Sequence, residues 1–352
     1  MIQKPNSAPL VRRALSFCAA AACATPALAD HLGPSAFGSG AGMAVFDAAT
    51  LDAAHWAAGL RLAYTRPDRR SDAELAALAG QHVHAHNTDY NFVASVSAAY
   101  GVTHHLTVSA ELPFVRRDHL REGTHAHSSG VALNGVEPLG TVAGFGDATI
   151  LAKYRLSEGE GPGFALVAGI KLPTGSTRHL SVEGDRLETE HQPGTGSWDP
   201  IFGASASAPI GAVTVSASAL YQLSTTGAQQ TRLGDRLQGG LAVSHRLGSR
   251  AQAYGELHNH HHGDELDDHV APKDSNWDLF FEVAGEWEGR QKVGGEVDQA
   301  SGGAWVYAAP GVRFNKSRWS ASASFAVPLW QDIRASHPNQ RYRLTLSLGR
   351  AF

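Results

Sequence analysis

The stretch YNFVASVSAAY, residues 90–100, decides the fold class because its side chains alternate between two kinds. Tyr90, Phe92, Val96 and Tyr100 stand at even positions with two alanines, and small or polar residues fill most of the positions between them. A side-chain period of two indicates a β-strand. Aromatic residues at both ends of about ten alternating residues are typical of a strand that crosses a membrane as part of a barrel.

The same alternation recurs along the chain, at residues 55–64, 106–114, 164–172, 213–221 and 319–327. A soluble β-sandwich also alternates, but it favours bulky residues on its core face and short loops. Here one face of each segment is apolar, and the other is rich in Ser, Gly and Ala with scattered charges. We therefore predict an all-β protein, a transmembrane antiparallel β-barrel.

The linkers between these segments alternate in length, which predicts the topology. Short linkers fall at residues 101–104, 157–162, 209–211, 248–249 and 315–316, and long ones at 65–88, 116–145, 174–196, 225–235, 262–303 and 329–340. Bacterial barrels have short periplasmic turns and long extracellular loops. This assignment predicts about twelve strands with both termini periplasmic. Trp277–Trp287 also resembles a strand, and we interpret it as an extension or hairpin inside the 262–303 loop.

The N-terminus has the pattern of a secretory signal peptide over residues 1–29. Lys4, Arg12 and Arg13 precede a short apolar run, and Ala27-Leu-Ala29 matches a cleavage site. A lipoprotein anchored through Cys23 is the alternative. Both cysteines lie in this segment, so cleavage after Ala29 leaves no thiol for disulfides, metal binding or catalysis. The expected organisation is a signal peptide (1–29), a periplasmic N-terminal segment or plug (30–54) and the outer-membrane barrel (55–352).

The C-terminal residues 342–352 place apolar side chains at alternate positions up to Phe352. This resembles the terminal strand that the outer-membrane assembly machinery of Gram-negative bacteria reads. Expected partners are therefore that machinery, outer-membrane lipid and a small-molecule solute, and the expected location is the outer membrane of a Gram-negative bacterium. The net charge is −4, so the basic footprint of a nucleic-acid-binding protein is missing.

Four motifs in the middle of the chain carry a family resemblance. They are GFGDATILAKYR at 144–155, IKLPTGSTR at 170–178, QPGTGSWDP at 192–200 and APGVRF at 309–314. Together they resemble outer-membrane proteins associated with the meta-pathway of phenol degradation. The resemblance implies a transporter or channel for aromatic compounds. The Pro-Thr-Gly and Pro-Gly-Thr-Gly sequences in these motifs also favour turns, so their role could be to shape the barrel at the ends of strands.

Histidine is unusually frequent, with 19 residues. Imidazole with carboxylate and without thiolate suits Zn, Ni, Co or Cu(II). If residues 82–86 are extended, His82, His84 and His86 lie on one side and can share an ion. We expect that the predicted function requires no cofactor. The loops could nevertheless bind one of these metals. The alternative to metal binding is a polar loop in which histidine has no special role. The candidate metal ligands are His82, His84, His86, His125, His127, His258, His260, His261 and His262.

Charged residues on the expected inner face bear on solute selectivity. Basic residues exceed acidic ones in this set, which would favour anionic solutes unless the charges pair with one another. No nucleophile motif such as Gly-x-Ser-x-Gly occurs, so we expect no enzyme. The predicted function is a channel or transporter for small solutes; the alternative is a surface metal-binding protein on a barrel scaffold. The candidate lumen residues are Arg61, Glu111, Lys153, Arg155, Lys171, Asp199, Arg246, Glu256, Arg318 and Arg343.

Overall fold

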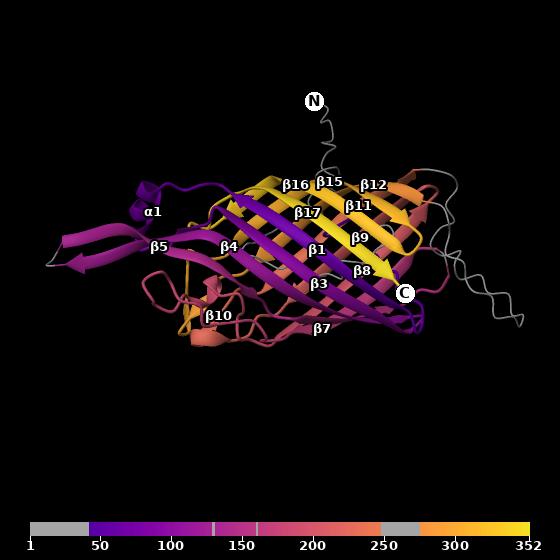
Figure 1. Ribbon diagram of the computed structural model, residues 1–352, viewed down its shortest axis with the longest axis horizontal. Helices are drawn as coiled ribbons and strands as arrows, with labels where there is room; N and C mark the ends of the chain where they lie inside the picture. The colour runs from indigo at the N-terminus through magenta and orange to yellow at the C-terminus, as the bar shows by residue number, and fades with distance from the viewer. Residues whose placement is uncertain (1–41, 129–130, 160, 248–274) are drawn as a thin grey trace, which may run out of the picture.

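Twelve antiparallel strands close into a barrel in the computed structural model, which describes residues 42–128, 131–159, 161–247 and 275–352 (Figure 1). The barrel strands are β1 (Trp56–Pro67), β3 (Tyr90–Thr103), β4 (Leu106–Ser128), β6 (Thr149–Arg155), β7 (Gly163–Lys171), β8 (Asp199–Ile210), β9 (Val213–Gln222), β11 (Arg236–Leu247), β12 (Ser275–Glu288), β15 (Gly303–Lys316), β16 (Trp319–Ile333) and β17 (Gln340–Ala351). β1 pairs with both β3 and β17, and β4 pairs with both β3 and β6, so no edge is left open. The predicted fold class and strand number are confirmed.

The barrel is apolar outside and polar inside, as the alternation predicts. On β1, Leu60 is 41% exposed and the adjacent Arg61 is 4% exposed; on β17, Leu346 is 42% exposed and Thr345 is 3% exposed. Large apolar side chains are exposed all around the outer surface of the barrel. This arrangement is typical of a transmembrane barrel, whose outer surface faces lipid. Among the described residues, no helix has the length and hydropathy needed to span a bilayer.

Aromatic side chains gather at both ends of the outer surface. At one end, the rings of Trp56 and Tyr100 lie 4.5 Å apart between centroids. At the other end, the ring of Tyr64 lies 5.3 Å from that of Tyr90 and 6.3 Å from that of Tyr342. Two aromatic bands at opposite strand ends match the girdles that sit at the two membrane interfaces.

The two ends of the barrel differ in the connections they carry. At the short-turn end, turns such as 104–105, 211–212 and 317–318 join neighbouring strands. At the long-loop end, the loops contain α1 (Asp72–Ala79), β2 (His86–Asn87), the 3-10 turns η1 (Thr189–His191) and η2 (Ala228–Gln230), and a small sheet of β10 (Thr231–Arg232), β13 (Lys292–Val293) and β14 (Glu296–Val297). The alternation of linker lengths predicted these two ends, with one exception at residues 248–274.

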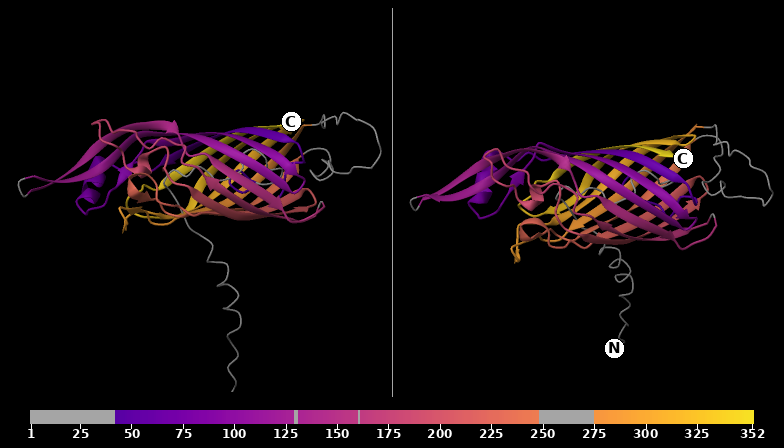
Figure 2. Two further views of the ribbon diagram at one scale, coloured as in Figure 1. Left: turned by 90° about the horizontal axis from the view of Figure 1, so that it is seen from below. Right: turned by 60° about the horizontal axis from the view of Figure 1, so that its bottom comes forward.

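The long linker predicted at 116–145 is a β-hairpin. β4 continues beyond the barrel and pairs with β5 (Val131–Phe145) from Phe114↔Phe145 to Ser128↔Val131. Both views in Figure 2 show this hairpin projecting from the long-loop end. α1 begins with a capping box, in which Ser71 and Glu74 satisfy each other's backbone N–H groups, and its contacts are with this hairpin.

One strand assignment from the sequence is wrong. Residues 275–288 are β12, a full barrel strand that pairs with β11 along Arg236↔Glu288 to Leu247↔Trp277 and with β15 on its other side. The strand expected at 250–261 and the turn at 248–249 lie outside the described residues, and β12 takes the place expected for that strand. Because Leu247 and Ser275 both lie at the short-turn end, the connection that carries residues 258–262 leaves and returns at that end.

The N-terminal segment, residues 42–54, contacts the inner wall of the barrel. The backbone N–H groups of Met43, Ala44 and Val45 donate to one oxygen of Glu282 on β12, at 2.9, 2.9 and 3.2 Å. Farther along, the side chain of Ser205 donates to the carbonyl of Asp47 at 2.9 Å. The segment then reaches the short-turn end, where Ala54 N–H donates to Gly101 O at 2.8 Å.

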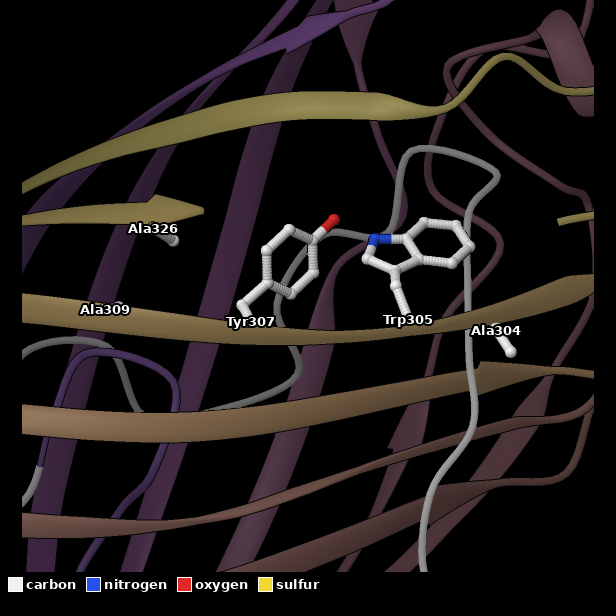
Figure 3. Close-up of a cluster of buried hydrophobic side chains, with 5 residues drawn as sticks. All are labelled: Ala304, Trp305, Tyr307, Ala309 and Ala326. Atoms are coloured by element: carbon white, nitrogen blue, oxygen red, sulfur yellow. The ribbon is translucent and has the colours of Figure 1, made fainter. Parts of the chain in front are cut away.

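Apolar side chains also occupy parts of the lumen. Phe46 packs against inward-facing residues of four consecutive strands, Leu151, Val167, Ile201 and Leu220. On β15, Trp305 and Tyr307 point into the barrel near the long-loop end, with ring centroids 6.4 Å apart (Figure 3). Both rings are almost fully buried, and Arg343 lies over the Tyr307 ring at 4.7 Å. The lumen is therefore partly filled by side chains rather than being a uniform water channel.

Candidate functional site in the barrel lumen

A cavity occupies the half of the lumen nearer the long-loop end. The empty space between its lining side chains is about 950 Å³, a value that includes open solvent. Arg61, Glu111, Glu286 and Arg343 line it from the barrel strands, and His86, Glu190, His191 and His337 line it from the loops. Arg61 links this cavity to the N-terminal segment, because it donates to Met43 O at 2.9 Å.

Three predicted lumen residues, Arg61, Glu111 and Arg343, line this cavity together. Arg343 donates to Glu286 on β12, with 2.7 Å between Nη1 and Oε1. Arg61 is buried among the charges of Glu111, Glu282, Glu286 and Arg343. The belt formed by Arg61, Glu111, Glu286 and Arg343 thus places two guanidinium groups and two carboxylates at one level of the lumen.

Four other predicted lumen residues form ion pairs on the wall of the barrel. Lys171 Nζ lies 2.9 Å from both Asp147 Oδ2 and Asp199 Oδ2. Arg246 Nε lies 2.7 Å from Asp278 Oδ1, and Lys153 Nζ lies 3.7 Å from Asp47 Oδ1 in the N-terminal segment. Each of these charges is neutralised by a neighbour of opposite sign. The ion pairs therefore hold the side chains and the N-terminal segment in place and do not create a net electrostatic field in the lumen.

Of the remaining three predicted lumen residues, Arg155 and Arg318 do not line the cavity, although Arg155 lies on the same face of β6 as the buried Lys153. Arg155 ends β6 and donates to Ser157 and to Gly159 O in the short turn that follows. Arg318 is exposed in the 317–318 turn. Glu256 lies outside the described residues.

The predicted basic residues of the lumen are largely paired, because β12 supplies acids that the sequence assignment placed in a loop. Asp278, Glu282, Glu286 and Glu288 alternate along β12, and all four are buried. Three of these carboxylates pair with arginines, namely Arg246, Arg343 and Arg236. The alternation of Trp277, Leu279, Phe281 and Val283 with these acids was the signal that could have identified the strand.

Three of the four sequence motifs meet at Lys171. The motif at 144–155 supplies Asp147, the motif at 170–178 supplies Lys171 itself, and the motif at 192–200 supplies Thr195, Ser197 and Asp199, all in contact with its ammonium group. Gly175 and Gly194 touch backbone to backbone, because a Cβ on Gly194 would come within 2.5 Å of Gly175 Cα. The motifs therefore build a structural junction, and turn chemistry accounts for their glycines and prolines.

The histidines of the first long loop do not share one site. His82 has a positive φ of 59° in the turn after α1, so the segment is not extended there, and its ring lies 4.7 Å from that of His125. His84 is exposed and lies 3.4 Å from Glu122 Oε1. His86 turns inward to the cavity. The side chain of His127 and residues His258, His260, His261 and His262 lie outside what the structure describes.

A buried histidine group lies at the long-loop end of the cavity. His86 from β2, His191 from η1 and His337 from the 334–339 loop have rings 4.6 Å apart in the pairs His86–His191 and His86–His337. Glu190 Oε1 lies 3.6 Å from His86 Nδ1 and 3.7 Å from His191 Nε2. Sequence reasoning missed Glu190, His191 and His337 as a set, since they are far from His86 in the chain.

Burial sets the charge state of this histidine group. Loss of hydration lowers the pKa of His191 to about 4 and that of His337 to about 3, and it lowers the pKa of His86 well below its usual value. The imidazoles are therefore neutral at neutral pH. The exposed neighbour His84 behaves oppositely, because its hydrogen bond to Glu122 raises its pKa to about 9.

Solved structures of outer-membrane proteins resemble this chain to different degrees. The solved structure of the COG4313 outer membrane channel from Pseudomonas putida F1 is similar with a TM-score of 0.55 and 16% identity, covering 87% of this chain and 98% of that one. The CymD monoaromatic hydrocarbon channel has a TM-score of 0.41 and 10% identity, over 86% and 89% of the two chains. The Ralstonia pickettii toluene transporter TbuX has a TM-score of 0.31 and 11% identity, over 87% and 92%.

A search of curated protein sequences found no match. The family described as "Putative MetA-pathway of phenol degradation" matches residues 67–284, which is more than half of the chain. This match agrees with the resemblance carried by the motifs at 144–155, 170–178 and 192–200, whose residues converge on Lys171. The chain belongs to the family described as "Putative MetA-pathway of phenol degradation".

Proposed function

We propose that this protein is an outer-membrane channel that passes small solutes through the barrel lumen. The observation that carries the proposal is the cavity in the lumen below the long loops, which charged and polar side chains line inside an apolar outer wall. Such a wall separates a polar path from lipid. The location is the outer membrane of a Gram-negative bacterium, with the short-turn end in the periplasm.

The solutes proposed first are small aromatic or anionic compounds. The belt of Arg61, Glu111, Glu286 and Arg343 offers two guanidinium groups, which bind carboxylates and stack on aromatic faces. Tyr307 adds an aromatic ring below Arg343. The acids of the belt balance its net charge, so selectivity arises from the position of these groups and not from an overall basic lumen.

The N-terminal segment is proposed to narrow or plug the channel. Its hydrogen bonds to Glu282 and Ser205 and the packing of Phe46 hold it against the wall between the cavity and the short-turn end. A barrel of twelve strands is only moderately wider than one of eight, whose interior side chains can fill. A segment inside it therefore takes up much of the cross-section, and its release would widen the path.

Planar-bilayer conductance of the refolded protein tests the channel function. We expect discrete conductance steps, and we expect benzoate to carry more current than benzylammonium, which has similar size and opposite charge. Arg343→Gln should reduce that preference, and Arg318→Gln, in an exposed turn, should not. Absence of conductance from both the wild type and a variant with the N-terminal segment released would overturn the proposal.

The alternative predicted from the sequence is a metal-binding protein that uses the barrel as a scaffold. One observation favours it as a second candidate, namely the convergence of His86, Glu190 and His191. These residues line the cavity, whereas the alternative placed the ligands on exposed loops. Bound metal would therefore lie in the path of the solute, so the two candidate functions are compatible.

A further inference from the structure

We propose that His86, His191 and Glu190 form a binding site for one divalent transition-metal ion of the Zn²⁺ class on the wall of the cavity. The site does not depend on channel activity, since its evidence is the arrangement of the three side chains. Imidazole and carboxylate ligands without thiolate suit Zn²⁺, Ni²⁺, Co²⁺ and Cu²⁺.

The distances match a tetrahedral ion. With metal–ligand bonds of about 2.0–2.2 Å, neighbouring ligand atoms of a tetrahedral site are about 3.4 Å apart. Glu190 Oε1 lies 3.6 Å from His86 Nδ1 and 3.7 Å from His191 Nε2. The ligand atoms of all three residues lie within 4.8 Å of one another, so the two imidazoles and the carboxylate would have to draw closer to complete the geometry.

Two of the three proposed ligands, both imidazole nitrogens, have no hydrogen-bond partner in their present arrangement. His86 Nδ1 and His191 Nε2 are buried and make no hydrogen bond. A buried polar atom without a partner costs about 1–3 kcal/mol, and native proteins contain few of them. Since both imidazoles are neutral, each has a lone pair to offer, and one ion would satisfy both atoms.

A second histidine orients the first. His86 Nε2 and His337 Nδ1 lie 2.9 Å apart in a hydrogen bond, which leaves Nδ1 of His86 for the ion. Metal-binding histidines commonly have their other ring nitrogen held in this way. The backbone around His337 is held in turn by Arg70, which donates to His337 O at 2.5 Å.

Acidic and basic groups both surround the site. Burial is the main cause that opposes ionisation of Glu190, and the nearby carboxylates of Glu188, Glu122 and Asp298 add to it. Glu122 Oε2 lies 3.9 Å from His191 Nε2 and is in reach as a fourth ligand. Arg70 and Arg117 are the nearby cations, and both are engaged with backbone carbonyls.

The site would join separate parts of the long-loop end. His86 comes from the 68–89 segment, Glu190 and His191 from the 172–198 segment, and the supporting His337 from the 334–339 loop. A bound ion would therefore cross-link two loops and be held by a third. Binding to the native state alone raises stability, so the ion should raise the thermal midpoint of the loops or of the whole barrel.

Isothermal titration of Zn²⁺ into the full chain refolded in detergent tests the site. His258, His260, His261 and His262 are replaced by Ser in every protein, so that this run does not contribute. Into this background we place His86→Gln, His191→Gln, Glu190→Gln and His337→Gln. The matched controls are His119→Gln and His125→Gln, which alter histidines of the long-loop end outside the candidate ligand groups. Circular dichroism confirms that each variant is folded.

We expect one Zn²⁺ per chain and a rise in thermal midpoint. His337→Gln should weaken Zn²⁺ binding by about 10–100-fold, which is the usual effect of replacing a residue that hydrogen-bonds to a metal ligand. Replacing a ligand should weaken it more, and the controls should stay within about threefold of the background. Co²⁺ should show the visible absorption of a tetrahedral complex, and His191→Gln should abolish it.

Two results would overturn the site. One is the absence of saturable binding of Zn²⁺, Ni²⁺, Co²⁺ and Cu²⁺ at micromolar protein, and the other is equal loss of binding in the His125→Gln control and the His191→Gln variant. Conductance of the same preparations is recorded without metal. A preparation that conducts but binds no ion rejects the metal site and leaves the channel function standing.

Discussion

The carboxylate of Glu282 on β12 accepts a hydrogen bond from the backbone N–H of Met43, with 2.9 Å between the two atoms, and so ties the N-terminal segment to the barrel wall. The next two backbone N–H groups converge on the same oxygen. Hydrogen bonds to a charged group contribute about 1.5–3 kcal/mol each, although three at one oxygen are not additive. This contact is therefore a principal anchor of the segment inside the lumen.

Glu282→Ala should release the start of the N-terminal segment and raise single-channel conductance. The three N–H groups lose their acceptor, while the strand pairing of β12 is made by its backbone and stays intact. Conductance in planar bilayers is the measurement. Glu296→Gln changes an exposed acid of β14 and is the control. Equal conductance of wild type and Glu282→Ala would show that the segment does not limit the path.

Phe46→Ala should loosen the same segment by removing its apolar anchor. Phe46 packs against Leu151, Val167, Ile201 and Leu220, and truncation of a buried phenylalanine costs about 3–5 kcal/mol. We expect higher or noisier conductance with an unchanged barrel. Phe202→Ala makes the same chemical change one residue from Ile201 on the outer face, where Phe202 is 56% exposed, and should leave conductance as in wild type. A similar effect of both changes would reject the assigned packing.

Lys171→Met should destabilise the barrel by about 3–5 kcal/mol, because it leaves Asp147 and Asp199 buried without their cation. The junction of the three motifs should weaken with it, since Thr195 and Ser197 also contact the ammonium group. Unfolding in urea from lipid vesicles measures the change. Lys292→Met, on the exposed β13, is the control. Unchanged stability of Lys171→Met would mean that the motifs have another role.

Leu346→Arg should lower the stability of the barrel by about 2–4 kcal/mol if the residue lies near the bilayer midplane, because Leu346 faces lipid. Ser347→Arg should be milder for stability, since Ser347 faces the lumen. Its hydroxyl contacts the sulfur of Met43 at 3.8 Å, so an arginine there should shift the N-terminal segment and change conductance instead. Folding yield in vesicles compares the two, and equal damage would show that the face assignment is wrong.

Labelling of intact cells should distinguish the two ends of the barrel. A tag inserted at Gly294–Gly295, in the β13–β14 turn at the long-loop end, should be accessible from outside. A tag inserted in the connection between Leu247 and Ser275 should become accessible only after the outer membrane is permeabilised, because both flanking strands end at the short-turn end. The reverse pattern would place the long loops in the periplasm.

The sequence by itself determined the barrel, its faces and its two kinds of ends. Alternation is a local property with a period of two, so residues such as Leu60 and Arg61 could be assigned to lipid and lumen without knowing their partners. The apolar face must meet lipid whichever strand lies beside it. For the same reason, the aromatic positions Trp56 and Tyr64 at the ends of one segment marked the two interfaces correctly.

The tertiary structure alone decided which segments pair and which side chains meet. β12 alternates as clearly as its neighbours, but its place between β11 and β15 depends on backbone hydrogen bonds that no local pattern specifies. That error hid Glu282 and Glu286, two of the acids that pair with or lie beside the arginines of the lumen. His86, His191 and His337 come together only because three loops fold over the same end of the closed barrel. Residues so far apart in the chain show no spacing pattern from which their contact could be predicted.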